Sequence, residues 1–145
     1  QTCALPILLI LGGYTDELGI EGIQLYDLFD QLPDETRAPF QSQGVAGTVL
    51  NYYIEMYLCE GTEVYVMRCP DGQEDVEGMN GKVAAIRLSG GTAYRTPRGL
   101  TVGDTAYRAW LLYGKCAFTS SFYYQVEDGY VSTIVFHTRY WGSSF

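Results

Sequence analysis

Residues 81–88 read GKVAAIRL and residues 129–136 read GYVSTIVF, so both follow the pattern Gly-x-Val-x-x-Ile-x-apolar. Each stretch begins at a turn signal, Asn80-Gly81 in the first and Asp128-Gly129 in the second. Such pairs favour type I′ hairpin turns because they tolerate a positive φ. We therefore expect two related units, each closed by one of these strands.

Two further echoes extend this self-similarity. Residues 22–33 align with residues 103–114, and residues 10–13 resemble residues 88–91 more weakly. The expected division is a remnant of a preceding unit at 8–18, a first α-β repeat at 19–91 and a second at 92–145. The two repeats are expected to form one compact domain.

Each repeat is predicted to begin with a short amphipathic helix. In the first, apolar residues follow the spacing i, i+3, i+4, i+7, which makes one stripe on a helix. They are Leu25, Leu28, Phe29 and Leu32. The second helix is predicted over Thr105–Tyr113, with Asp104 as N-cap and Gly114 just past the end. Its inward residues are expected to be Ala106, Ala109, Trp110 and Tyr113.

The strands are predicted from period-two alternation. Thr48–Cys59 and Phe118–Glu127 each alternate apolar with polar residues, which is typical of an antiparallel sheet with one packed and one solvated face. Residues 33–47, 70–81 and 90–98 carry Pro, Gly and acidic residues and are predicted to be loops. The predicted fold class is α+β, with tandem helix-plus-antiparallel-sheet repeats and the helices packed on one face of the sheet.

Composition limits the partners. The chain of 145 residues is 47% hydrophobic and has a formal charge of −8, with no basic stripe. An acidic surface repels phosphate backbones and anionic membranes, so nucleic acid is not an expected partner. Membrane contact is expected only through a lipid anchor upstream of the sequence.

The first seven residues, QTCALPI, resemble the in-frame translation of a short-read sequencing adapter. We therefore expect residues 1–7 to be an artefact and leave them out of the fold prediction. The alternative is a native segment, such as the tail of a signal sequence. Without Cys3, the cysteines are Cys59, Cys69 and Cys116.

These cysteines do not predict a metal site. No CxxC occurs, and His137 alone cannot complete a Cys/His zinc set. A hairpin turning at residues 60–61 would separate Cys59 from Cys69 by roughly 17 Å, beyond the reach of a disulfide. A bridge from either of them to Cys116 stays open.

No catalytic fingerprint occurs, so the chain is not expected to be an enzyme and no cofactor is expected. His137 is predicted to be a surface histidine. The acidic stretch 71–77 departs from the EF-hand spacing and is predicted to be a solvated loop rather than a calcium site. Arg95 and Arg98 could grip a carboxylate or phosphate, although balancing local charge is the more ordinary role.

The candidate binding surface is the polar face of the sheet, where tyrosines alternate with small polar and acidic residues. Its members are Asn51, Tyr53, Glu55, Tyr57, Ser121, Tyr123 and Gln125. Tyrosine offers a large contact area at low rotamer entropy, and such surfaces bind proteins or sugars. The alternative is that these tyrosines simply pair across strands, since tyrosine is a good strand former.

One stretch carries a resemblance. Residues 96–105, TPRGLTVGDT, followed by LLYG at 111–114, resemble a segment of secreted bacterial proteins with β-lactamase-inhibitory-protein-like repeats. Small outer-membrane assembly lipoproteins share that helix-then-sheet unit, and the clear similarity spans about 81–139. The resemblance implies an extracytoplasmic, non-enzymatic module whose sheet face or loops contact protein. It does not imply lactamase inhibition.

The predicted function is thus a secreted or cell-envelope protein-interaction module. One alternative is a carbohydrate-binding module, which would use the same tyrosines as stacking platforms. The other is an accessory domain of an enzyme whose catalytic part lies upstream.

Overall fold

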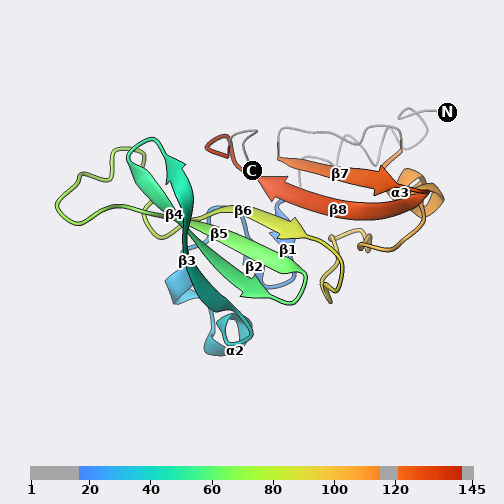
Figure 1. The fold of residues 1–145 in the computed structure, drawn as a ribbon, viewed down its shortest axis with the longest axis horizontal. Coiled ribbons are helices and arrows are strands. Elements are labelled where there is room, and N and C mark those ends of the chain that lie inside the picture. Colours follow the sequence, from blue (N-terminus) through green and yellow to red (C-terminus); the bar gives the residue numbers. More distant parts are fainter. Residues whose placement is uncertain (1–16, 115–120, 142–145) are drawn as a thin grey trace.

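The computed structural model describes residues 17–114 and 121–141, and within them one antiparallel sheet dominates. Its strand order is β3-β4-β5-β6-β8-β7, with β3 at one end and β7 at the other (Figure 1). The strands are β3 (Gln41–Val49), β4 (Tyr52–Cys59), β5 (Thr62–Arg68), β6 (Val83–Leu88), β7 (Phe122–Glu127) and β8 (Tyr130–His137). A separate small hairpin pairs β1 (Gly19–Ile20) with β2 (Ile23–Gln24).

The prediction of tandem helix-plus-sheet repeats is wrong. The helical elements are the 3₁₀ turn η2 (Phe29–Gln31), the single turn α2 (Asp34–Arg37) and the helix α3 (Ala106–Tyr113). They do not form a repeated layer over the sheet, which is continuous. The two similar stretches that suggested repeats lie in β6 and β8, and these strands pair with each other, with Leu88 opposite Ile134.

The first predicted helix is replaced by a turn at residues 25–26, a bridge at Leu28 and the 3₁₀ turn η2, for a physical reason. The Tyr26 N–H donates to the Val83 carbonyl at 2.9 Å, and the Phe29 N–H donates to the Gly81 carbonyl at 3.0 Å. These donors are therefore not available for a helical ladder, and Tyr26 has a φ of 73°, outside the right-handed helical region. Leu25 and Phe29 are buried nevertheless. Leu28, predicted to belong to the same apolar stripe, is 42% exposed, and it forms an isolated bridge with Lys82 at the margin of the sheet.

The predicted helix at 105–113 is confirmed as α3, with a different cap. The Thr105 hydroxyl accepts a hydrogen bond from the Arg108 N–H at 3.1 Å, so Thr105 and not Asp104 is the N-cap. Asp104 instead accepts from the Thr101 N–H at 2.9 Å. Ala109 and Tyr113 are buried as expected, whereas Trp110, predicted to point inward, is 36% exposed.

Both faces of the sheet carry apolar packing. We call the side of Tyr57, Val64 and Ile86 the first face; it holds the larger core, which includes Phe136 and Tyr113 of α3. The second face holds a smaller core. Its buried residues are Tyr52, Ile54, Tyr65, Met67, Met79, Ala84 and Ala85. The expected division into one packed and one solvated face therefore does not hold.

The loop predictions succeed in two of three cases. Residues 70–81 and 90–98 contain no helix or strand, as expected. Residues 33–47, predicted to be a loop, contain α2 and most of β3, because their Gly and Ser residues sit in a bulged edge strand. No helix in the described part of the chain is both long and apolar enough to cross a membrane.

Candidate functional site

The predicted tyrosine surface is split between the two faces of the sheet. Along one row of the register, Tyr57 lies opposite Val64, and this row continues through Ile86 and Phe136 to Phe122. The next row runs from Leu58 through Glu63, Arg87 and Val135 to Tyr123. Since neighbouring rows point to opposite sides, Tyr57 and Tyr123 cannot share a surface.

The structure groups the other candidates accordingly. Tyr53 and Glu55 accompany Tyr57 on the first face, whereas Gln125 accompanies Tyr123 on the second. Three strands, β5, β6 and β8, separate β4 from β7. Asn51 is exposed in the turn between β3 and β4. Ser121 precedes β7, and its carbonyl accepts a hydrogen bond from the His137 N–H at 2.9 Å.

On β4, Glu55 and Tyr57 belong to a charged network centred on Arg68. The Arg68 guanidinium donates to Glu55 Oε1 at 3.0 Å, to the Tyr57 hydroxyl at 2.6 Å and to both carboxylate oxygens of Asp30. Ser42 Oγ donates to the second Glu55 oxygen at 2.6 Å. The Tyr57 ring packs on Phe29, with centroids 4.3 Å apart. Both the ring and the hydroxyl of Tyr57 are thus already engaged within the chain.

The contacts of this network favour the ionised forms of Asp30 and Glu55. Hydrogen bonding from Arg68 holds the pKa of Asp30 below its ordinary value. Burial alone would raise the pKa of Glu55, but hydrogen bonds from Ser42, Tyr57 and Arg68 outweigh it and lower that pKa. Carboxylates held ionised in this way serve poorly as general acids near neutral pH. The network therefore acts as a structural clamp between β4, β5 and η2.

On β7, Tyr123 lies beside the single histidine of the chain. The Tyr123 and His137 ring centroids are 5.8 Å apart, and the His137 side chain is half-buried on the second face. His137, Ser121 and Arg139 line a cavity of about 320 Å³ together with Leu18, Leu25, Tyr26 and Thr138. His137 is thus less exposed than a surface histidine, and its ring packs against an aromatic neighbour.

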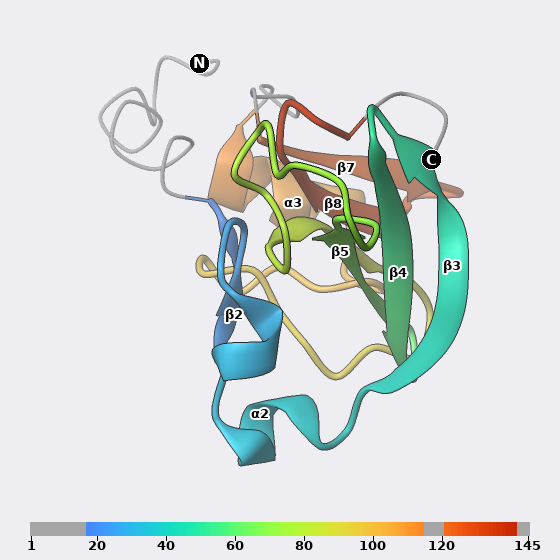
Figure 2. The same cartoon turned by 90° about the vertical axis from the view of Figure 1, so that its left-hand side faces the viewer.

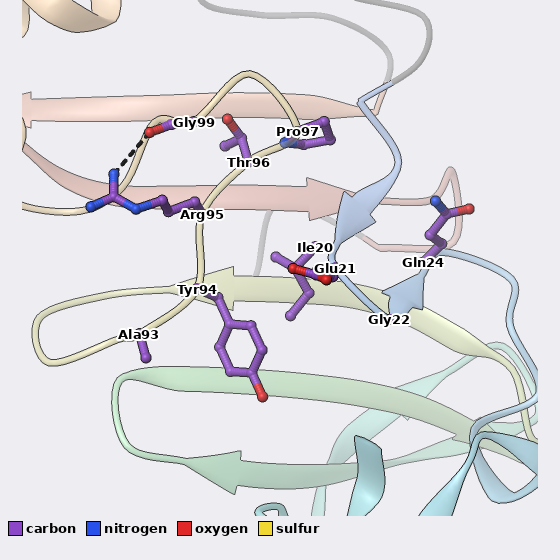
Figure 3. Close-up of a pocket in the computed structure, with 10 residues that line it drawn as sticks. All are labelled: Ile20, Glu21, Gly22, Gln24, Ala93, Tyr94, Arg95, Thr96, Pro97 and Gly99. Carbon is purple, nitrogen blue, oxygen red and sulfur yellow. Dashed lines mark hydrogen bonds between the residues drawn. The ribbon is translucent and has the colours of Figure 1, made fainter. Parts of the chain in front are cut away.

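A larger cavity of about 700 Å³ lies between the β1–β2 hairpin and residues 93–99 (Figure 3). Its lining includes Tyr94, Arg95 and Glu21. Figure 3 shows the Tyr94 ring and the Arg95 side chain pointing away from one another, and Arg95 donates to the Gly99 carbonyl at 3.0 Å. The aromatic and charged groups therefore do not converge on one point, as a small-molecule site requires.

Arg98, the second arginine of the expected anion grip, has a structural role. Its guanidinium donates to the Leu112 carbonyl at 2.6 Å and lies over the Tyr113 ring, 5.0 Å from the centroid. A cation at this position satisfies a carbonyl in the last turn of α3 and complements the helix dipole. Arg95 and Arg98 therefore do not form a joint anion site.

Hydrogen bonds to Asp75 organise the acidic loop at 71–77. The Asp75 carboxylate accepts hydrogen bonds from the Tyr52 hydroxyl and from the Met79 N–H, the latter at 2.9 Å. The hydrogen bond from Tyr52 lowers the pKa of Asp75. Among residues 17–114 and 121–141, no group of three or more His, Cys, Asp or Glu side chains could hold a metal ion.

The cysteines that the structure describes, Cys59 and Cys69, are free, which confirms that they do not pair. Cys3 and Cys116 lie outside the described residues.

The exposed apolar side chains of α3 indicate a function more clearly than the charged network, the two cavities or the cysteines.

Sequence reasoning missed the outward side of α3. Tyr107, Trp110 and Leu111 stand at i, i+3 and i+4 and are 67%, 36% and 52% exposed. We call these three residues the outer stripe. The Tyr107 and Trp110 rings stack, with centroids 6.3 Å apart. The inner residues Ala109 and Tyr113 are buried, so α3 is apolar on both sides.

The outer stripe has a neighbour on β8. The Ala106 N–H donates to the Gly129 carbonyl at 2.9 Å, and Thr105 forms a bridge with Tyr130, so the β7–β8 turn lies at the start of α3. Tyr130 is 55% exposed. The sequence of α3, AYRAWLLY, has one charged residue in eight, which could have indicated a helix with apolar residues on its outer side. A helix that is apolar all round is normally buried.

Comparison of the chain with protein-family models, with curated proteins and with solved structures gives no match.

Proposed function

We propose that this chain is a non-catalytic, extracytoplasmic protein-binding module whose partner contacts the outer stripe of α3. The observation that carries the proposal is the apolar outer side of a surface helix whose inner side is already packed. Ala109 and Tyr113 are buried and Leu112 packs against the same core, so the inner side of α3 already covers the sheet, while Tyr107 and Leu111 are mostly exposed.

The chemistry of the stripe suits a protein partner. Tryptophan and tyrosine dominate the energetics of protein interfaces because they bury a large area and keep a polar group. Arg108 lies between the two aromatic residues in sequence, and its side chain is 50% exposed. Arginine is also enriched at interface centres. The resemblance of residues 96–114 to exported bacterial proteins supports the extracytoplasmic part of the proposal.

The tyrosines of the sheet take a secondary place in this proposal. Tyr53 on the first face and Tyr123 on the second could contact two different partners but not one flat surface. The packing of Tyr57 on Phe29 also argues against the carbohydrate alternative, since a stacking platform needs an open ring face.

The test is capture of a partner from the cell envelope of the organism that encodes the chain. The bait proteins are the wild type, a Tyr107→Ala/Trp110→Ala variant and a Val76→Ala control, Val76 being 64% exposed in the acidic loop. We expect one set of proteins to be retained by the wild type and the control and lost with the double variant. Equal retention by all three baits would reject the stripe as the binding surface.

Two controls sharpen this test. Circular dichroism must show the same melting temperature for the three baits, so that loss of capture does not reflect unfolding. A glycan array probed with the wild type separates the alternatives, because sugar binding without a protein partner would favour a carbohydrate-binding module.

A further inference from the structure

A second surface, independent of α3, lies at the other end of the sheet. β3 is an edge strand, and seven of its nine residues are exposed. Figure 2 shows β3 running along the outer side of the sheet beside β4. Within residues 17–114 and 121–141, no strand pairs with its free side. An unpaired edge presents a row of backbone N–H and C=O groups that can accept another strand.

The β3 edge lacks the usual charged protection. No residue from 38 to 54 is charged, although 18% of the whole chain is. Proteins commonly place lysine or another charge on exposed edges to prevent pairing. The opposite edge strand, β7, is shorter and ends at the acidic pair Glu127-Asp128. The β7 edge therefore carries acidic residues at its end, whereas the β3 edge carries no charged residue.

The register of β3 against β4 shifts on both sides of Val45. Val45 lies opposite Glu55, Ser42 lies opposite Tyr57, and Thr48 lies opposite Tyr53. Three residues of β3 thus match two of β4 on each side of Val45, with a register shift in each half. These bulges twist the strand, and Gly44, on one side of Val45, has a φ of 86°.

The residues of this edge, QSQGVAGTV, are complementary to themselves in an antiparallel pair. If two β3 strands run antiparallel about an axis through Val45, each Val45 faces its own copy. Ser42 then faces Thr48 of the other copy, and Gly44 faces Ala46. β-branched pairs and Ser–Thr pairs are favourable across strands, and no like charges meet. Such an arrangement is the two-fold interface that most homodimers use.

The net charge of −8 on each copy opposes association, but not at the edge itself. Glu55 lies opposite Val45 on β4, and Arg68 contacts its carboxylate at 3.0 Å. Three strand spacings, about 14 Å, would separate the two Glu55 residues. That distance exceeds the Debye length of about 8 Å at physiological salt.

We propose that two copies of this chain pair antiparallel through β3, about a two-fold axis at Val45, and form one continuous sheet. The contact is a single strand pair, so the dimer is expected to be weak and dependent on concentration. Because distant acidic groups repel, its affinity should rise with salt.

The test is to measure the molecular mass of the full chain by sedimentation equilibrium under reducing conditions. Protein concentrations from about 5 to 500 µM cover the dissociation constants expected of a small interface. The variants are Val45→Lys and the control Val76→Lys, since these valines are 65% and 64% exposed. We expect the wild type and Val76→Lys to dimerise, and Val45→Lys to dimerise about tenfold more weakly or worse because it sets two lysines face to face. A monomeric wild type, or an unchanged Val45→Lys dimer, would overturn the proposal.

Hydrogen exchange locates the contact even if Val45→Lys folds poorly. The amides of residues 41–49 should exchange more slowly in the wild type as its concentration rises. Unchanged exchange there while the protein dimerises would assign the contact to another surface and reject the proposal. Trp110→Ala should dimerise like the wild type, so the outcome is separate from that of partner binding at α3. If the wild type is monomeric, pairing between copies is rejected, and the β3 edge stays open to a strand of a different protein.

Discussion

Arg68 on β5 grips Asp30 of η2 at two points, with Nη1 2.6 Å from Oδ2 and Nη2 3.1 Å from Oδ1. Through the same guanidinium, η2 is tied to Glu55 on β4. The Arg68 side chain is 14% exposed, and it adds an ionic contact to the backbone hydrogen bonds that join residues 26–29 to residues 81–83. Together with the burial of Leu25 and Phe29, these contacts fix the position of a segment with little regular structure.

Replacing Arg68 should destabilise the fold more than replacing an exposed arginine. Arg68→Met leaves Glu55 and the Tyr57 hydroxyl without their cation, and we expect a loss of about 2 kcal/mol in the free energy of unfolding. The control is Arg139→Met, whose side chain is 77% exposed beside Glu77. It should change stability by less than about 0.5 kcal/mol. Urea unfolding measures both, and equal losses would show that the clamp has no special role.

The same clamp predicts how stability depends on pH. The pKa values of Asp30 and Glu55 lie below their ordinary values in the folded chain. Their contribution is therefore present above the unfolded values, near pH 4, and is lost as the pH falls through the lower folded values. We expect the stability difference between wild type and Arg68→Met to be constant from about pH 6 to 8 and to shrink below about pH 4. Urea unfolding at each pH tests this, and a difference independent of pH would contradict it.

The cap of α3 distinguishes the structure from the expectation based on sequence. Because the Thr105 hydroxyl accepts the Arg108 N–H, Thr105→Ala should cost about 1 kcal/mol, while Thr105→Ser should cost little. Asp104→Ala would remove a different hydrogen bond, from the Thr101 N–H. Hydrogen exchange of the Arg108 amide reports on the cap itself. Faster exchange in Asp104→Ala but not in Thr105→Ala would show that the cap was assigned to the wrong residue.

Truncating a residue on the inner side of α3 should lower the stability much more than truncating one on the outer side. Tyr113 is fully buried against Phe122, with ring centroids 4.8 Å apart, so Tyr113→Ala should cost about 3 kcal/mol or more. Tyr107 is 67% exposed, so Tyr107→Ala should change stability by less than about 0.5 kcal/mol. Thermal unfolding followed by circular dichroism compares them. A large loss for Tyr107→Ala would mean that the outer stripe serves the fold and not a partner.

The sequence predicted local features better than their assembly. The helix at 105–113 and the turns before Gly81 and Gly129 are present, and β4 and β7 lie within the strands predicted at 48–59 and 118–127. Residues 50–51 form a turn, however, so the first of these predictions begins too early, and Val126, expected to be buried, is 42% exposed. Periodicity identifies such strands and helices because it depends on neighbours in the chain. It misread residues 25–32, where an apolar spacing of 3 and 4 also fits a segment whose backbone pairs with 81–83. Only the tertiary partner distinguishes the two cases.

The candidate site failed for a related reason. Alternation shows which residues of one strand share a face with Tyr57, and which residues of another strand share a face with Tyr123. It does not show whether those two faces are on the same side of the sheet. The register fixes that relation, and here it sends the two residues to opposite faces. The outer stripe was visible as a helix with one charged residue in eight, yet Trp110 was assigned inward because both sides of α3 are apolar.

Site-specific photocrosslinking tests the central claim most directly. A photoreactive phenylalanine analogue is placed at Tyr107 on α3, at Tyr53 on the first face or at Tyr123 on the second, and each chain is produced in the organism that encodes it. We predict a covalent adduct with one cell-envelope protein from position 107, and none with that protein from positions 53 and 123. An adduct from position 53 or 123 with none from 107 would contradict the assignment of α3 as the binding surface.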